Sequence, residues 1–243
     1  MKVCIIGDGL TGLALAKALS NYGISVDIIS TIKIKKYNKI RTLGISKSNV
    51  EFFNKNILNI EKLQWKINRI EIYNENLKNE KILNFEKKNE FLFSIIKNFE
   101  LNKLLMSDLK KNKLIKFKKL TKELNIMKLN YKLIFNCDNN NSITKNLFYK
   151  KIDKSYNSFA YTTIIKHKEL TDNHCASQIF TKIGPIAFLP LSKSQTSVVY
   201  SIKGKNKPCL ENLIKKYNIK YEIKEIDEIF NFELKSSSLR FYH

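Results

Sequence analysis

The feature that most constrains this chain is a glycine-rich turn between a short apolar segment and a helix-forming segment near its start. Residues 2–6 (KVCII) predict a buried strand, and the turn G-D-G-L-T-G spans residues 7–12. Residues 10–19 are rich in Leu and Ala, which favour helix, and Gly23 suits the left-handed position that ends a helix. Residues 24–29 form a second apolar, β-branched segment. This order and spacing predict a right-handed β–α–β unit that binds a dinucleotide.

Each glycine of the turn has a distinct predicted task. Gly7 permits the tight turn out of the strand, Gly9 lets the backbone approach a pyrophosphate, and Gly12 lets the helix pack closely on the sheet. Leu10 and Thr11 open the helix, where free N–H groups and the positive end of the helix dipole favour phosphate. The alternative is a glycine-rich turn that binds no ligand.

The acidic residue that normally ends the second strand and binds the ribose hydroxyls is absent. Ser30 stands at the end of that strand, and Asp27 lies three positions earlier, where we expect it to face the wrong way. A hydroxyl group binds a ribose hydroxyl less strongly than a carboxylate does. We therefore predict a weakened cofactor affinity, which the substitution Ser30→Glu should change.

The remainder of the chain alternates less regularly. Ser48 and Glu51 form a capping box that predicts the start of a helix after residues 41–46. Further strands are predicted within 67–93 and at 131–137, 158–166, 176–181, 185–191 and 196–202, and helices at about 99–111 and 211–217. The chain thus begins as α/β and continues mainly as β, which predicts two interleaved domains.

The composition is strongly basic, with a formal net charge of +22. Such a charge suits a surface that binds nucleic acid or anionic lipid. However, only three of the 44 basic residues are arginine, the side chain that contacts bases in bidentate fashion. Lysine, asparagine and isoleucine are abundant, as in proteins of AT-rich genomes. We therefore expect a solvated lysine-rich surface and no nucleic-acid partner.

The four cysteines form no C-x-x-C pair and no cluster with histidine, which argues against zinc and against a disulfide framework. The apolar run at residues 3–6 is too short for a signal peptide. No run approaches the roughly 18 apolar residues of a transmembrane helix. We expect a cytoplasmic protein whose membrane contact, if it has one, is peripheral.

Several motifs occur in the order found in one known family. They are R-T-L-G-I-S at residues 41–46, F-N-C-D-N-N-N-S at 135–142 and G-P-I-A-F-L-P-L at 184–191, all after the glycine turn. With them the chain resembles the class A FAD-dependent monooxygenases. Within that class it is most similar to the ubiquinone-biosynthesis aromatic-ring hydroxylases, the 2-polyprenylphenol and 2-polyprenyl-6-methoxyphenol hydroxylase group.

The resemblance implies a Rossmann-like FAD-binding domain interleaved with a mainly antiparallel β substrate domain, like that of p-hydroxybenzoate hydroxylase. The FAD-binding domain would comprise residues 1–66 and 98–152, and the substrate domain residues 67–97 and 153–235. Residues 236–243 would begin the return of the chain to the FAD-binding domain.

The resemblance also assigns roles to individual residues. The glycine turn would hold the ADP pyrophosphate, and Ser30 takes the place of the ribose-binding acid. Arg41 matches an arginine near the flavin, and Asp138 matches an aspartate near the pyrophosphate and ribityl chain. The strand at 184–191 would lie beside the ring site. The alternatives are a surface arginine and a loop aspartate, since both residue types are common in turns.

The chain departs from the family pattern at four places. Ser30 replaces the acid, Asn139 replaces the glycine that follows the aspartate, and Phe99 stands where many members have arginine. The later G-D motif of the family, which supplies another helix N-terminus to the flavin phosphates, is not present before the chain ends at His243. Relative to the family, we therefore expect the chain to be C-terminally incomplete.

The implied reaction uses FAD, NAD(P)H and O2 to hydroxylate an electron-rich ring in ubiquinone biosynthesis. It needs no metal or side-chain nucleophile, no catalytic side chain is assigned, and we expect His167, His174 and His243 to be surface residues. A polyprenylphenol substrate resides in membranes, so lysines could aid peripheral docking at the inner membrane surface by about 1 kcal/mol each. A quinone-biosynthesis complex would be a further partner. Two alternatives are an inactive FAD-domain remnant that acts as a binding protein and another FAD-dependent oxidoreductase of this fold.

Overall fold

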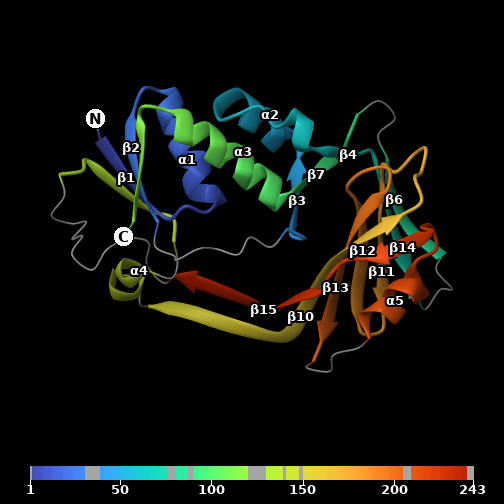
Figure 1. Cartoon of the computed structure of the whole chain (residues 1–243). Coiled ribbons are helices and arrows are strands. Elements are labelled where there is room, and N and C mark those ends of the chain that lie inside the picture. Colours follow the sequence, from blue (N-terminus) through green and yellow to red (C-terminus); the bar gives the residue numbers. More distant parts are fainter. Residues whose placement is uncertain are drawn as a thin grey trace.

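The computed structural model describes residues 2–30, 39–75, 80–86, 90–119, 130–138, 141–147, 150–204 and 209–239. Figure 1 shows a helix-covered sheet at the N-terminal end of the chain and a larger sheet beside it, with a small sheet between them. Asn139 and His243 lie outside the described residues, so the expectations about them stay predictions.

The first sheet is parallel and has four strands in the order β8-β2-β1-β9. Its strands are β1 (Lys2–Ile6), β2 (Ser25–Ser30), β8 (Ile115–Lys119) and β9 (Leu133–Asn136). Because β1 lies between β2 and β9, the residues that follow these three strands meet at one edge of the sheet. The β–α–β unit predicted from the glycine turn is confirmed, with α1 (Leu10–Asn21) as its helix.

Two helices cover one face of this sheet, α1 and α3 (Asn98–Lys111). Val3 and Ile5 point toward them, and they pack with the leucines of α3 in one buried cluster. Burial of each such side chain contributes about 1.5–3 kcal/mol. Lys17 of α1 also pairs with Asp108 of α3, at 2.8 Å. The helix predicted at 99–111 is therefore confirmed to within a residue.

The opposite face of the sheet holds a buried charge. Asp27, only 1% exposed, pairs with Lys118 at 2.7 Å and with Lys2 at 3.1 Å, and it accepts a hydrogen bond from the Tyr131 hydroxyl. Burial alone would raise the pKa of Asp27, but hydrogen bonds from Lys118, Tyr131 and Lys2 outweigh it and lower the pKa. Asp27 thus lies on the face opposite the helices, where its ion pairs stabilise the fold.

A small antiparallel sheet joins β3 (Thr42–Ser46), β7 (Phe93–Lys97) and β4 (Trp65–Ile67). The helix α2 (Lys47–Asn56) directly follows β3 and begins earlier than the capping box predicted. Ser46 is the N-cap: it has extended backbone angles, and its hydroxyl accepts a hydrogen bond from the Asn49 amide. The prediction of Ser48 as the cap is wrong because the strand β3 ends directly in the helix.

The third sheet has the strand order β14-β10-β13-β12-β11-β5-β6, with β15 also paired to β10. These strands are β5 (Arg69–Asn74), β6 (Glu80–Glu86), β10 (Lys151–His167), β11 (Cys175–Thr181), β12 (Gly184–Pro190), β13 (Gln195–Lys203), β14 (Ile223–Ile226) and β15 (Phe230–Leu239). All pairs but one are antiparallel, and the exception is the parallel pair β5–β11. A mainly antiparallel sheet is therefore confirmed.

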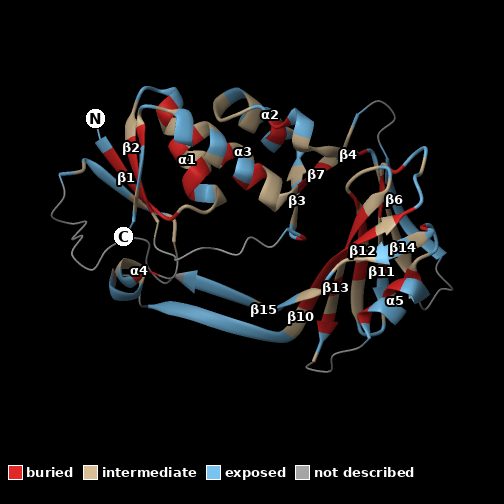
Figure 2. Cartoon of the chain, viewed as in Figure 1, coloured by how far each residue is buried: buried red, intermediate tan, exposed pale blue. Residues whose placement is uncertain are grey.

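The helix α5 (Leu210–Tyr217) packs on one face of this sheet through Leu210, Ile214 and Tyr217. Figure 2 shows the buried residues concentrated where helices cover the sheets, and the outer part of β10 and β15 exposed. The remaining short elements are η1 (Glu61–Leu63) and α4 (Ser142–Leu147). Across the described residues, no helix is long and apolar enough to span a membrane.

His167 is buried, with 3% of its surface exposed, so the expectation of a surface histidine is wrong for this residue. Its Nδ1 lies 2.8 Å from the Lys168 carbonyl oxygen and its Nε2 lies 3.0 Å from the Thr196 hydroxyl. Because a carbonyl only accepts, Nδ1 carries the proton and Nε2 accepts from Thr196. Burial lowers the pKa of His167, which keeps the ring neutral and structural.

Candidate functional site

The three glycines of the turn are required for three different reasons. Gly7 has a φ of +108°, which favours glycine. A Cβ at Gly12 would lie 2.1 Å from the Gly7 carbonyl oxygen, so only glycine lets α1 pack this closely on the turn. Gly9 has an ordinary φ of −74°, and a Cβ there would meet nothing within 4 Å. Neither backbone conformation nor packing within the described residues thus explains Gly9.

The open space at Gly9 adjoins the start of α1. Gly9 is the N-cap of that helix and has no side chain with which to cap it. Its carbonyl accepts the first helical hydrogen bond, from the Leu13 amide at 2.9 Å. The amides of Leu10, Thr11 and Gly12 precede that bond, so they have no helical carbonyl to pair with. A cradle with an open glycine and such amides fits the pyrophosphate of FAD.

Asp138 lies directly beside this turn. A Cβ at Gly7 would be 3.1 Å from the Asp138 Cβ, although 131 residues separate them in the chain. Hydrogen bonds from the Asn141 side-chain amide and the Thr144 hydroxyl to the Asp138 backbone carbonyl oxygen fix the backbone at this point. The structure therefore brings together two parts of the predicted site, the glycine turn and Asp138.

Ser30 also adjoins the turn. Its hydroxyl donates a hydrogen bond to the carboxylate of Asp8 over 2.9 Å. Both side chains are half-buried. An acidic group is therefore present at the end of β2 after all, but it comes from the glycine turn of β1.

Arg41 directly precedes β3, a strand of the small sheet that lies between the parallel sheet and the large sheet (Figure 1). Its carbonyl oxygen accepts a hydrogen bond from the Asn98 amide at the start of α3. The next residue, Thr42, contacts Ser197 of β13 through hydroxyl groups 3.3 Å apart. The Arg41 side chain is exposed. Arg41 is thus placed between the two domains and away from the glycine turn, so an extended ligand would be needed to reach both.

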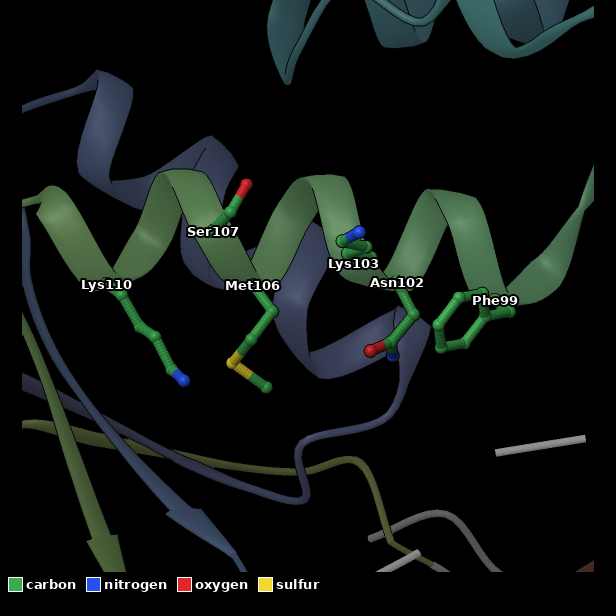
Figure 3. A pocket seen from close by; sticks show the side chains of 6 residues that line it. All are labelled: Phe99, Asn102, Lys103, Met106, Ser107 and Lys110. Atoms are coloured by element: carbon green, nitrogen blue, oxygen red, sulfur yellow. The ribbon is translucent and has the colours of Figure 1, made fainter. Parts of the chain in front are cut away.

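A pocket with a volume of about 280 Å³ lies along α3, and sequence reasoning did not find it. Figure 3 shows Phe99, Asn102, Met106 and Lys110 extending from one face of the helix. Asn102 is only 5% exposed. This pocket could hold an apolar ring with one hydrogen-bonding edge.

The sequence did contain a signal for this pocket. Asn102 lies three and seven residues before the buried Leu105 and Leu109, at the spacing of one helix face. A buried polar side chain on an apolar helix face normally has a hydrogen-bond partner or a ligand.

Within the described residues, no group of three His, Cys, Asp or Glu side chains could hold a metal ion.

The parallel sheet with its glycine turn has the architecture of a dinucleotide-binding domain, and together with the large antiparallel sheet it gives a fold similar to that of solved FAD-containing monooxygenases of the p-hydroxybenzoate hydroxylase type. The chain belongs to the FAD binding domain family, which matches residues 1–125. That family and the cradle geometry agree on the cofactor, FAD.

Three known proteins are similar to this chain, one in part of its sequence and two in fold over most of its length. Ubiquinone biosynthesis monooxygenase COQ6 of Xenopus tropicalis is 36% identical over 75 residues, which are 30% of this chain and 16% of that protein. The p-nitrophenol 4-monooxygenase PnpA of Pseudomonas putida has a TM-score of 0.76 at 10% identity, covering 98% of this chain and 69% of that one. HpxO of Klebsiella pneumoniae, solved with FAD and uric acid, has a TM-score of 0.69 at 12% identity, with 97% and 68% covered.

Proposed function

We propose that this chain carries the FAD and the aromatic substrate of a monooxygenase that hydroxylates a polyprenylphenol-type ring in ubiquinone biosynthesis, with NAD(P)H and O2. The observation that carries the proposal is the glycine cradle in a chain whose large antiparallel sheet contacts the small sheet of the FAD-binding part through Ser197 and Thr42. The partial similarity to COQ6 supports the choice of a quinone precursor.

Bound FAD would supply the redox chemistry. The side chains at the junction of the two domains would orient the ring and exclude water. Ile67, Ile95 and Ala176 form a buried cluster there. Leu189 and Leu191 pack against it, and both belong to the motif expected beside the ring site. This apolar wall suits a hydrocarbon-substituted ring.

A lysine at the junction joins the two sheets. Lys97 at the end of β7 donates a hydrogen bond to Gln195 of β13 over 2.9 Å. It also lies 3.8 Å from Glu100. Through these partners Lys97 connects the small sheet to the large sheet.

The membrane part of the proposal rests on charge. With a net charge of +22 and a substrate that carries a polyprenyl tail, the chain would dock at the cytoplasmic face of the inner membrane. Sedimentation with liposomes tests it: binding should rise with the fraction of anionic lipid and fall with added salt. Binding that is independent of anionic lipid would contradict docking.

The enzymatic proposal is tested with the purified chain, FAD and a short-chain polyprenylphenol. We expect NADH or NADPH to drive O2 uptake that the phenol stimulates, with a product heavier by one oxygen atom in mass spectrometry. O2 uptake without a hydroxylated product would instead identify an oxidase or reductase of this fold. FAD binding without NAD(P)H oxidation would identify a binding protein.

A further inference from the structure

The hydrogen bond between Ser30 and Asp8 joins the ends of two adjacent strands. Ile6 of β1 and Ile29 of β2 are paired in register, and the Gly7 amide donates to the Ile29 carbonyl over 2.8 Å. Ser30 is therefore the last residue of β2, and Asp8 lies two residues beyond the end of β1, so both stand at the same edge of the sheet. Its hydroxyl reaches the Asp8 carboxylate over 2.9 Å. This geometry puts a carboxylate at the strand end where dinucleotide-binding folds bind ribose.

We propose that Asp8 supplies the ribose-binding carboxylate that residue 30 lacks, and that Ser30 orients it. A carboxylate offers about four lone-pair sites, so it can accept from Ser30 and from a ribose hydroxyl together. The ligand recognised is the ribose of the adenosine half of FAD, and the inference rests on the proposed FAD binding.

The inference reverses the effect expected of Ser30→Glu. With Asp8 in contact with residue 30, a glutamate at position 30 would place two carboxylates side by side, and their repulsion would weaken binding. The exchange Asp8→Ser with Ser30→Glu keeps one carboxylate and one hydroxyl, so it should bind FAD more tightly than either single variant.

The test compares ADP with 2′,3′-dideoxy-ADP as competitors that displace FAD, followed by flavin fluorescence. The wild-type chain should prefer ADP roughly 10-fold or more, because a charged hydrogen bond to the ribose is lost with the dideoxy compound. In Asp8→Asn this preference should fall to within about twofold, and FAD affinity should drop roughly 10-fold. Asp153→Asn, an exposed substitution on β10, is the matched control and should change neither.

The outcomes separate the inference from the proposed function. If the wild-type chain binds no FAD, both are overturned. If it binds FAD and Asp8→Asn keeps the same preference for ADP, or binds FAD more tightly, the role of Asp8 is overturned while FAD binding stands. If Asp8→Asn lowered the affinity for ADP and for its dideoxy analogue equally, Asp8 would only maintain the turn, which also overturns the inference.

Discussion

The glycine turn yields a prediction in which two similar substitutions have opposite effects. In Gly12→Ala the new Cβ would lie 2.1 Å from the Gly7 carbonyl oxygen and 3.3 Å from Ile5 Cγ2. Backbone on both sides of the clash must separate by about 1 Å to restore van der Waals contact. Overpacking of a core costs about 1–3 kcal/mol, and a clash with backbone belongs at the upper end. For a chain of this size we expect the melting temperature to fall by roughly 6–12 °C.

Gly9→Ala should behave differently. Its Cβ would meet nothing within 4 Å, and its φ of −74° is ordinary for alanine. The apoprotein should therefore melt at the wild-type temperature or slightly higher. Alanine lowers the conformational entropy of the unfolded chain, which stabilises the folded state by about 0.4–1 kcal/mol. The methyl group would, however, occupy the space assigned to the pyrophosphate, so FAD affinity should fall at least about tenfold.

The two readouts are the melting curve of the apoprotein, followed by circular dichroism, and the dissociation constant for FAD, from flavin fluorescence. Unchanged FAD affinity in Gly9→Ala would refute the placement of the pyrophosphate at Gly9. An unchanged melting temperature in Gly12→Ala would refute the close packing of α1 on the turn.

Three further predictions concern polar side chains of the fold. Asp27→Asn should destabilise the fold by about 1–3 kcal/mol, because Lys118 and Lys2 lose their charged partner; urea unfolding that matches the wild type would contradict this. Hydrogen bonds from Lys216, the Lys182 amide and Tyr217 lower the pKa of Glu75 to about 2. Since the folded pKa is depressed, this stabilisation is present above about pH 4.5 and is lost as the pH falls toward 2. Glu75→Gln should therefore make the free energy of unfolding fall less steeply between these pH values. A fall as steep as that of the wild type would count against this. Asn102→Leu should preserve or raise apoprotein stability, because an apolar side chain replaces a buried polar one on the apolar face of α3; a melting temperature below that of the wild type would contradict this.

The parts of the fold that depend on local sequence were predictable. The turn at residues 7–12 could be assigned because its glycines, the flanking apolar segments and Gly23 all lie within one short stretch. The strand that precedes Asp138 and the strand of the 184–191 motif could likewise be placed, since each is an apolar run bounded by turn residues. The cofactor followed from these motifs, and the family match agrees with it.

Contacts between distant residues were not predictable in this way. The parallel pair β5–β11 and the contact of Gly7 with Asp138 depend on how the chain returns to the sheet. The hydrogen bond of Ser30 to Asp8 depends on the register of β1 against β2. His167 looked like a surface residue because nothing in its neighbours indicates the hydroxyl of Thr196, which arrives from another strand.

The claim that this chain holds FAD by its glycine turn is tested most directly by calorimetric titration of the purified apoprotein with FAD. We predict saturation at one FAD for each chain and competition by ADP, because the turn contacts the pyrophosphate. Absence of binding at millimolar FAD, or binding that ADP does not displace, would contradict the assignment of the turn as the FAD cradle.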